Sequence, residues 1–226
     1  MHIEQDFQNY YTKHLSKGSL DLYYMNQQIE NSMTPYILEE REMRATQIDI
    51  FSRLMRDRII WVAGEVNDKM STVVQAQLMF LDNSDKSDIT MHVDSPGGSV
   101  KSGLSMVDVM QYITCDIRTV NTGMAASMGS VLLGAGTKGK RSSLRFSKTM
   151  LHQTSGGAGG NIQDARINFK EWEKTNKILF ELLADFCGKT PEEVTRDAER
   201  DFWLSAEEAL EYGIIDEVVK TKKKGS

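Results

Sequence analysis

The sequence is poor in the residues that mark several large classes of protein. Its 226 residues include only two cysteines, Cys115 and Cys187, too few for a disulfide framework, and this favours a reducing compartment. No apolar run approaches the ~20 residues that span a bilayer, and no positively charged segment followed by an apolar one marks a secretory signal. We therefore expect a cytoplasmic protein without a membrane partner.

Basic residues are also in the minority. The 27 Lys and Arg residues are outnumbered by 32 Asp and Glu residues, which gives a net charge of −5. No basic stripe interleaved with aromatic residues is present, so nucleic acid is not an expected partner.

Composition also divides the chain into three parts. Residues 1–34 are polar without a clean period and predict an extension, a propeptide or an axial segment, with one weak helix at 20–30. Residues 35–219 predict one domain, and residues 220–226 predict a solvated basic tail or a cloning remnant.

Strand and helix patterns alternate from residue 59 onward. Apolar strands at 59–63, 88–93 and 117–120 are separated by amphipathic segments that Asn67 and Ser99 can cap. This alternation with short connections predicts an α/β domain with largely parallel strands. Further patterns predict a helix at 49–56, strands at 149–153 and 214–219, and helices after the capping residues Thr190 and Ser205.

One predicted helix is unusually long. It covers 161–187, ends at Gly188, and at 1.5 Å per residue would reach about 40 Å. A compact domain of this size does not need such a length, so one end should project. Its first half carries an apolar stripe that predicts self-association, formed by Ile162, Ala165, Phe169 and Trp172.

The stretch GMAASMG at 123–129 joins the third strand to a short apolar helix at about 127–133. A serine on such a bend is held out from the backbone beside the free amides of the helix start, as in a nucleophile elbow. The pattern is incomplete, since Ala125 stands where the usual first glycine would be. The alternative is a packed turn in which Ser127 only caps the helix.

Two segments of the chain are rich in glycine, residues 134–141 and residues 155–160. Residues 134–141 match the start of a phosphate-binding loop, but Arg141 replaces the Ser or Thr that would hold magnesium, and the segment follows a helix instead of a strand. It predicts a surface turn, and the chain should have no ATPase of its own. Residues 155–160 have few side chains and could accept another backbone as an added strand, or form a flexible loop.

Serine acyl transfer needs a base and a group that orients it. His152 lies at the end of a strand that follows the elbow, where a base could face Ser127. Asp201 precedes a capped helix and could be buried against an imidazole, or be an ordinary loop or cap acid. The order Ser, His, Asp differs from that of α/β-hydrolases, which run Ser, acid, His. Spacing alone does not show that the three residues meet.

The chain resembles the proteolytic subunits of Clp proteases, the ClpP family, over about residues 35–219. The resemblance rests on five stretches, DIFSRLM at 49–55, DSPGGSV at 94–100, GMAASMG at 123–129, MLHQ at 150–153 and ERDFWLSA at 199–206. It implies a crotonase-like spiral fold and an ATP-dependent serine endopeptidase that cleaves unfolded proteins. Ser127 would be the nucleophile, His152 the general base and acid, and Asp201 its orienter. The backbone N–H groups of Gly98 and Met128 would form the oxyanion hole.

The resemblance also implies partners. Two stacked seven-membered rings would associate through the long handle helix, and Glu199 and Arg200 resemble the family's charged ring-to-ring sensor. An AAA+ unfoldase such as ClpX or ClpA would feed the chamber and use the ATP, so this chain should hold no cofactor and no metal. The residues expected along the substrate strand are Gly97, Ser99, Val100, Thr154, Ser155 and Gly156.

Several positions depart from the family pattern. Thr154 stands where proline usually follows His-Gln. In the aromatic pocket that receives unfoldase loops, Thr90, His92 and Ser142 replace aromatic residues, and only Tyr112 remains aromatic. These changes suggest a mixed particle with a second ClpP paralogue, or an unfoldase with differently shaped loops.

Two other functions remain open. A crotonase-like acyl-CoA enzyme would explain the glycine turns but gives no joint role to Ser127, His152 and Asp201. A non-catalytic ring subunit would keep the three residues but align them poorly.

Overall fold

The computed structural model describes residues 36–41, 44–154 and 161–220. The chain divides into two units, Met1–Arg53 and Leu54–Ser226, and each is described by itself. In the first unit, β1 (Tyr36–Arg41) and β2 (Arg44–Asp49) form an antiparallel hairpin that leads into α3 (Ile50–Arg56). Asp49 caps this helix, since its Oδ1 accepts a hydrogen bond from the Ser52 amide at 2.9 Å. The helix predicted at 20–30 lies outside the described residues.

The second unit is built on a parallel sheet with the strand order β3-β4-β5-β6-β9. These strands are β3 (Ile59–Ala63), β4 (Ile89–Ser95), β5 (Ile117–Ala126), β6 (Arg141–Leu144) and β9 (Glu217–Val219). A further strand, β7 (Lys148–Leu151), pairs parallel with the end of β5 and antiparallel with β8 (Phe202–Leu204). The predicted α/β class with largely parallel strands is confirmed.

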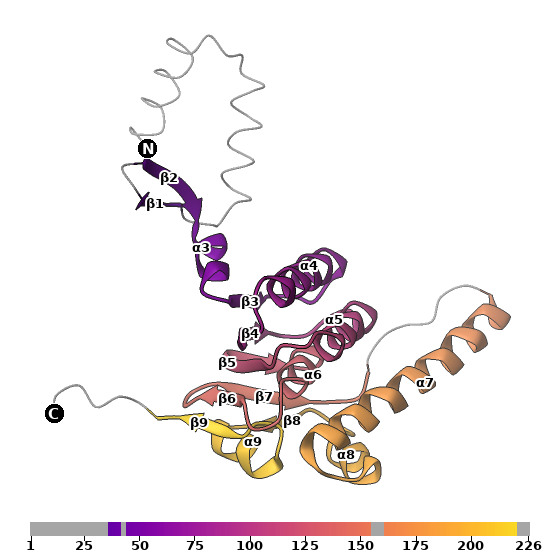
Figure 1. Ribbon diagram of the computed structural model, residues 1–226. Helices are drawn as coiled ribbons and strands as arrows, with labels where there is room; N and C mark the ends of the chain where they lie inside the picture. Colours follow the sequence, from indigo (N-terminus) through magenta and orange to yellow (C-terminus); the bar gives the residue numbers. More distant parts are fainter. Residues whose placement is uncertain (1–35, 42–43, 155–160, 221–226) are drawn as a thin grey trace, which may run out of the picture. The chain divides into compact units, whose positions relative to one another are not determined.

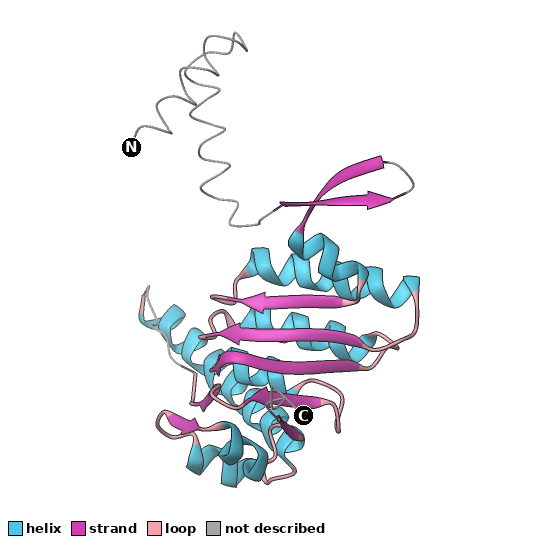
Figure 2. Ribbon diagram, turned by 90° about the vertical axis from the view of Figure 1, so that its left-hand side faces the viewer, coloured by secondary structure: helices cyan, strands magenta, loops and turns pink. Residues whose placement is uncertain are grey.

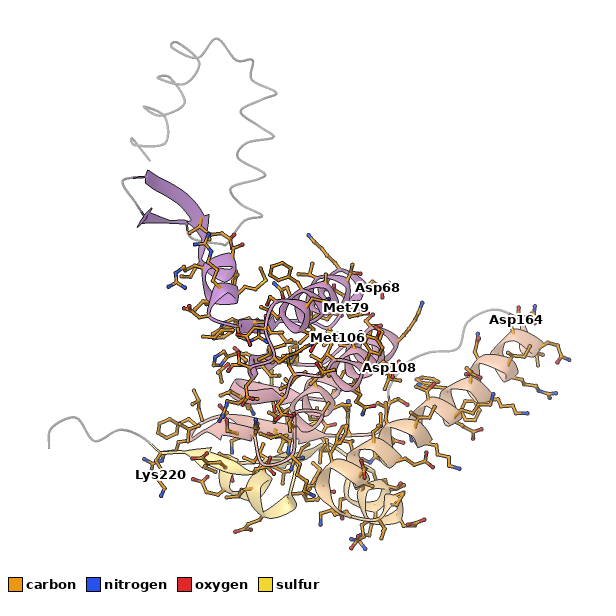
Figure 3. All side chains as sticks on the ribbon, viewed as in Figure 1. Asp68, Met79, Met106, Asp108, Asp164 and Lys220 are labelled. Carbon is orange, nitrogen blue, oxygen red and sulfur yellow. The ribbon has the colours of Figure 1, made fainter. Side chains whose placement is uncertain are left out.

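Three helices cover one face of this sheet, α4 (Asp68–Ser84), α5 (Val100–Tyr112) and α6 (Met128–Gly134) (Figure 1). Alternation along β4 explains the arrangement, because Met91 and Val93 are fully buried toward the helices while His92 points the other way and is only partly buried. Side chains such as Met106 fill the space between sheet and helices (Figure 3). Figure 2 looks onto the opposite face, which α4, α5 and α6 leave uncovered.

Strand β5 is longer than its apolar run predicts. The sequence pattern ends at Val120, but the strand continues to Ala126, because Met124, Ala125 and Ala126 pair with β7. Asn121 interrupts the apolar pattern although it is fully buried, and its Nδ2 donates to the Lys148 carbonyl at 3.0 Å. Because its hydrogen bond is satisfied, the polar Asn121 can be buried in β5, and a hydropathy pattern therefore misses the part of the strand after Val120.

The long helix α7 (Ile162–Cys187) has the predicted ends. Asn161 caps its start, and Gly188 ends it in the left-handed conformation with φ +66°. Its buried residues all lie in the second half, at Leu179, Phe180, Leu183 and Ala184. The first half projects from the sheet and carries Asp164 near its outer end (Figures 1 and 3).

The apolar stripe of α7 is only partly exposed. Ile162 and Phe169 are exposed, at 74% and 56%, whereas Ala165 and Trp172 are partly buried. Self-association through this stripe remains a prediction.

The last part of the chain holds two short helices, α8 (Pro191–Asp197) and α9 (Ala206–Tyr212), and both have the predicted capping boxes. The strand predicted at 214–219 is shorter, since only Glu217–Val219 pairs as β9. Ile214 is fully buried but belongs to the turn that closes α9, where its amide donates to the Ala209 carbonyl at 3.2 Å. The apolar pair Ile214 and Ile215 after a helix thus has the same sequence pattern as the start of a strand.

Both cysteines are free thiols, Cys115 buried and Cys187 partly buried. Burial raises the pKa of the Cys187 thiol to about 12, which keeps it protonated.

Arg141 is a buried hub at the start of β6. Its side chain is 2% exposed, and it pairs with Asp216 through Nη2–Oδ1 at 2.6 Å and Nε–Oδ2 at 2.8 Å. The guanidinium also donates to the carbonyls of Phe186 at 2.8 Å and Gly213 at 3.0 Å. Burial opposes ionisation of Asp216, but the hydrogen bonds from Arg141 hold its pKa below the ordinary value. The residue that excluded a phosphate-binding loop therefore joins the ends of α7 and α9 to the sheet.

Replacing Arg141 should destabilise the fold strongly. Arg141→Met leaves the partly buried Asp216 carboxylate without its guanidinium partner, and breaking a buried pair from one side costs about 3–5 kcal/mol. Urea unfolding at fixed protein concentration measures the loss. The matched control is Lys174→Met, which removes an exposed pair with Glu171 and should cost much less. Equal losses in the two variants would contradict the role of Arg141 as a hub.

Candidate active site

A rigid glycine turn follows β4. Gly97 and Gly98 have φ values of +94° and +145°, which side chains rarely adopt. Val66 fixes the turn on both sides, because its amide donates to the Gly97 carbonyl and its carbonyl accepts from the Ser99 amide, both at 2.8 Å. The Gly97 amide also donates to Ser95 Oγ at 3.1 Å. The turn therefore has little freedom to move.

Ser127 stands on the bend between β5 and α6 with an unusual backbone. Its φ of +54° and ψ of −121° make it one of two described residues other than glycine with positive φ. Its amide donates to the Met150 carbonyl at 2.9 Å, which fixes the bend against β7. Ser127 occupies the N-cap position of α6, but its hydroxyl caps no amide. The packed-turn alternative therefore does not account for the hydroxyl.

The glycine turn and the serine bend are in close contact. A Cβ on Gly97 would lie 2.7 Å from Ser127 Cβ and 2.9 Å from the Met128 amide nitrogen. On the other side of the bend, a Cβ on Gly129 would lie 2.8 Å from the Ser95 carbonyl oxygen. Two chain segments thus press together at positions where only glycine fits.

The structure brings Ser127, His152 and Asp201 together. His152 Nε2 lies 2.8 Å from Ser127 Oγ, and His152 Nδ1 lies 3.2 Å from Asp201 Oδ1. Strand pairing explains both contacts. Ala126 pairs with Met150, which places Ser127 near the end of β7. Leu151 pairs antiparallel with Phe202, so His152, directly after β7, lies beside Asp201, directly before β8.

The acid is more exposed than the sequence suggested. The Asp201 side chain is 62% exposed, whereas that of His152 is 22% exposed. Asp201 ends the loop before the short strand β8, whose pairing with β7 leaves the carboxylate at the open edge. The contact with the imidazole is present, but the carboxylate is not buried against the ring, which the sequence left as one of two alternatives.

The amides of Gly98 and Met128 flank Ser127, and in the described part of the chain neither donates a hydrogen bond. Both residues line a small recess of about 50 Å³ together with Ser127 and His152. Four apolar side chains also line it, Val100, Val131, Leu179 and Leu183, together with the polar residues Ser130 and Thr154. The arrangement provides two free donors and a partly apolar recess beside one hydroxyl.

The residues expected along a substrate strand have different places. Val100 and Thr154 line the recess. Ser99 caps α5, since its Oγ accepts from the Ser102 amide at 3.3 Å, and its side chain therefore has a local structural role. Ser155 and Gly156 lie outside the described residues. Glu199 and Arg200 are exposed and line an open hollow with His152 and Asp201.

Comparison with known proteins agrees with this geometry. The family model described as Clp protease matches residues 40–222. A protein of Bacteroides fragilis named "ATP-dependent Clp protease proteolytic subunit" is 47% identical over 96% of this chain and 99% of its own length. Proteins of the same name are 45% identical in Porphyromonas gingivalis, covering 97% of this chain and 99% of the relative, and 45% identical in Ligilactobacillus salivarius, covering 85% and 98%.

The chain belongs to the Clp protease family. The predicted family, its α/β fold and the activity class of a serine peptidase are thereby confirmed. Nothing in the comparisons favours the acyl-CoA enzyme.

The residues expected to receive unfoldase loops in this Clp family chain lie mostly on one sheet face. Trp61, His92, Val120 and Ser142 are in register across β3, β4, β5 and β6, and Thr90 lies two residues before His92 on the same face. Trp61 stacks on His92 with ring centroids 4.7 Å apart. Tyr112 lies at the end of α5 and is 78% exposed.

Trp61 was not among the residues expected on this face. Its signal was present in the alternation of 59–63, which places Trp61 opposite the buried Ile60 and Val62. Burial lowers the pKa of His92, and its Nδ1 is buried without a hydrogen-bond partner among the described residues. The face is therefore less polar than its composition indicates.

The described residues contain neither a cluster of metal ligands nor a helix that could span a membrane. No group of three or more His, Cys, Asp and Glu side chains is placed to hold a metal ion. Nor does any helix in those segments combine the length and apolar character needed to cross a membrane.

The contact between Gly97 and Ser127 makes a direct prediction. Gly97→Ala should slow labelling of Ser127 by a fluorophosphonate probe on the order of 100-fold, because the added methyl group displaces the serine and lies against the Met128 amide. Gly139→Ala is the matched control, since Gly139 has a similar φ of +85° and no atom within 4 Å of a Cβ. It should cost about 1–3 kcal/mol of stability without slowing labelling. Equal labelling in both variants would refute the steric argument.

Proposed function

We propose that this chain is the proteolytic subunit of an ATP-dependent Clp protease, with Ser127 as nucleophile, His152 as general base and Asp201 as its orienting acid. The observation that carries the proposal is the pair of contacts at 2.8 Å and 3.2 Å that join the three side chains. It also favours an active subunit over a non-catalytic one with a poorly aligned site.

The chemistry follows from these contacts. As Ser127 Oγ attacks the peptide carbonyl, His152 Nε2 takes its proton, and Asp201 stabilises the imidazolium that forms. The developing oxyanion accepts hydrogen bonds from the free amides of Gly98 and Met128. His152 then donates the proton to the leaving amine, and water releases the acyl group by the same steps in reverse.

The substrate is an extended segment of an unfolded protein. Its backbone would lie along residues 97–100 as an added strand, extended by Thr154, Ser155 and Gly156. The recess lined by Val100, Val131, Leu179 and Leu183 supports an apolar side chain beside the cleaved bond.

The assembly would follow from α7. Its exposed Ile162 and Phe169 would be covered when two seven-membered rings stack, with Glu199 and Arg200 as the charged sensor between rings. An AAA+ unfoldase would supply substrate in the cytoplasm and hydrolyse the ATP, so this chain itself would need no cofactor.

Substitution of the three residues tests the proposal. Ser127→Ala or His152→Ala should lower turnover of a short fluorogenic peptide on the order of 10⁶-fold, and Asp201→Ala on the order of 10⁴-fold. The residues act as a unit, so the Ser127→Ala/His152→Ala double variant should be scarcely worse than either single variant. Circular dichroism checks that each variant is folded. Wild-type turnover by Ser127→Ala would remove the nucleophile assignment.

We also propose that a ring made only of this chain docks an unfoldase weakly. Thr90, His92 and Ser142 offer less apolar surface than aromatic residues would, although Trp61 supplies one ring on that face. Several loops dock together, so small losses multiply through effective concentration. A mixed particle would solve this, with a second ClpP paralogue forming the docking ring.

Reconstitution tests the docking proposal. The purified chain, with its own organism's unfoldase, ATP and a tagged folded substrate, should degrade little, while peptide turnover is normal. Thr90→Tyr combined with His92→Tyr should tighten docking about tenfold or more, since each buried apolar side chain contributes about 1.5–3 kcal/mol. Robust degradation by the chain alone would exclude the mixed particle.

A further inference from the structure

Thr154 makes two hydrogen bonds, and a proline at this position could make neither. Its amide donates to Asn176 Oδ1 at 3.0 Å, and its hydroxyl lies 3.2 Å from the same oxygen. Proline has no N–H group, so the departure from the family pattern at position 154 makes the first bond possible. Thr154 and Asn176 are both partly buried, which limits competition by water.

Asn176 has a special place on α7. In the described part of the chain, it is the one α7 side chain that hydrogen-bonds to a segment distant in the sequence, the loop after β7. The buried residues of the helix begin three positions later at Leu179, on the same helical face, and Leu179 lines the recess beside Ser127. Asn176 therefore ties α7 to the loop after β7, at the point where the helix begins to project from the second unit. We call its two hydrogen bonds with Thr154 the tether.

The segment that Asn176 holds begins at His152, the residue that carries the imidazole. His152 directly follows β7, and Gln153 is fixed on one side, where its amide donates to the Ala198 carbonyl at 3.0 Å and its Nε2 to the Glu199 carbonyl at 3.2 Å. Thr154 is fixed on the other side by Asn176. The two residues after the base are thus anchored to the segment that leads to Asp201 and to α7.

We propose that Asn176 is a positioning residue, which through Thr154 ties α7 to the segment carrying His152 and holds the imidazole within proton-transfer distance of Ser127. The inference rests on the proposed function, because it assumes that His152 is the base. It adds that the orientation of the base depends on a contact with α7 as well as on Asp201.

The experiment measures turnover per active site. Fluorophosphonate titration of Ser127 counts the active sites, and kcat and KM for a short peptide are then compared among variants of the full chain. Asn176→Leu removes the acceptor and should lower kcat per site about tenfold with KM nearly unchanged, since one or two hydrogen bonds of ordinary strength are lost. Asn176→Asp keeps an acceptor oxygen and should retain kcat within about threefold.

Three further variants separate positioning from general stability. Thr154→Pro removes the amide donor, so the Thr154→Pro/Asn176→Leu double variant should be no slower than Asn176→Leu alone. Thr154→Val removes only the hydroxyl and should cost about threefold, which tests the tether even where Asn176→Leu fails to fold. Asn168→Leu, the same change at an exposed position of the same helix, should leave kcat per site unchanged, with particle size checked on a sizing column.

The outcomes distinguish this proposal from the proposed function. Unlabelled wild-type Ser127 would refute the proposed function itself. Normal labelling, with wild-type kcat per site in Asn176→Leu and Thr154→Val, would overturn the tether alone. Fewer titratable sites with unchanged kcat per site would also overturn it, because that result indicates a purely structural role.

Discussion

The site depends on one steric constraint, the approach of the turn after β4 to the bend after β5. Gly97 leaves no room for a Cβ beside Ser127, and the serine takes a backbone conformation that side chains rarely adopt. Because β4 and β5 are parallel neighbours, their carboxyl ends meet at one sheet edge, and the two bends must share that space. The free amides of Gly98 and Met128 lie where these bends meet, so the same constraint places the donors beside the hydroxyl.

The sequence predicted the helix ends well, because they depend on hydrogen bonds between residues close together in the chain. The capping residues Asn67, Thr190 and Ser205 and the ending glycine Gly188 act through hydrogen bonds within a few residues of the chain, so their patterns are readable from the sequence. The second half of β5 was missed because its partner is β7, which lies more than twenty residues further along the chain. Trp61 was missed on the open face because alternation along one strand shows on which face a residue lies, but not which residues of the neighbouring strands lie beside it.

The three site residues illustrate the same limit. The serine bend and a histidine after a strand could be found from the sequence, but their contact depends on the register of β5 with β7, and the contact with Asp201 on the register of β7 with β8. Register is fixed by tertiary packing and carries no signal in spacing over 49 residues. Only the family resemblance linked the three, and it did not tell that the Asp201 side chain is largely exposed.

The exposure of Asp201 has a consequence for how its contact with His152 works. Water weakens the attraction between a carboxylate and an imidazolium, so an exposed acid orients its base less firmly than a covered one. The open hollow beside this pair is lined by Glu199 and Arg200, the residues proposed to contact another ring. A surface that covered the hollow would exclude water from the pair and strengthen its attraction without moving any atom of the site. In the chain by itself, orientation of the imidazole therefore relies more on backbone pairing and on the anchored segment 152–154 than on the charge of the acid.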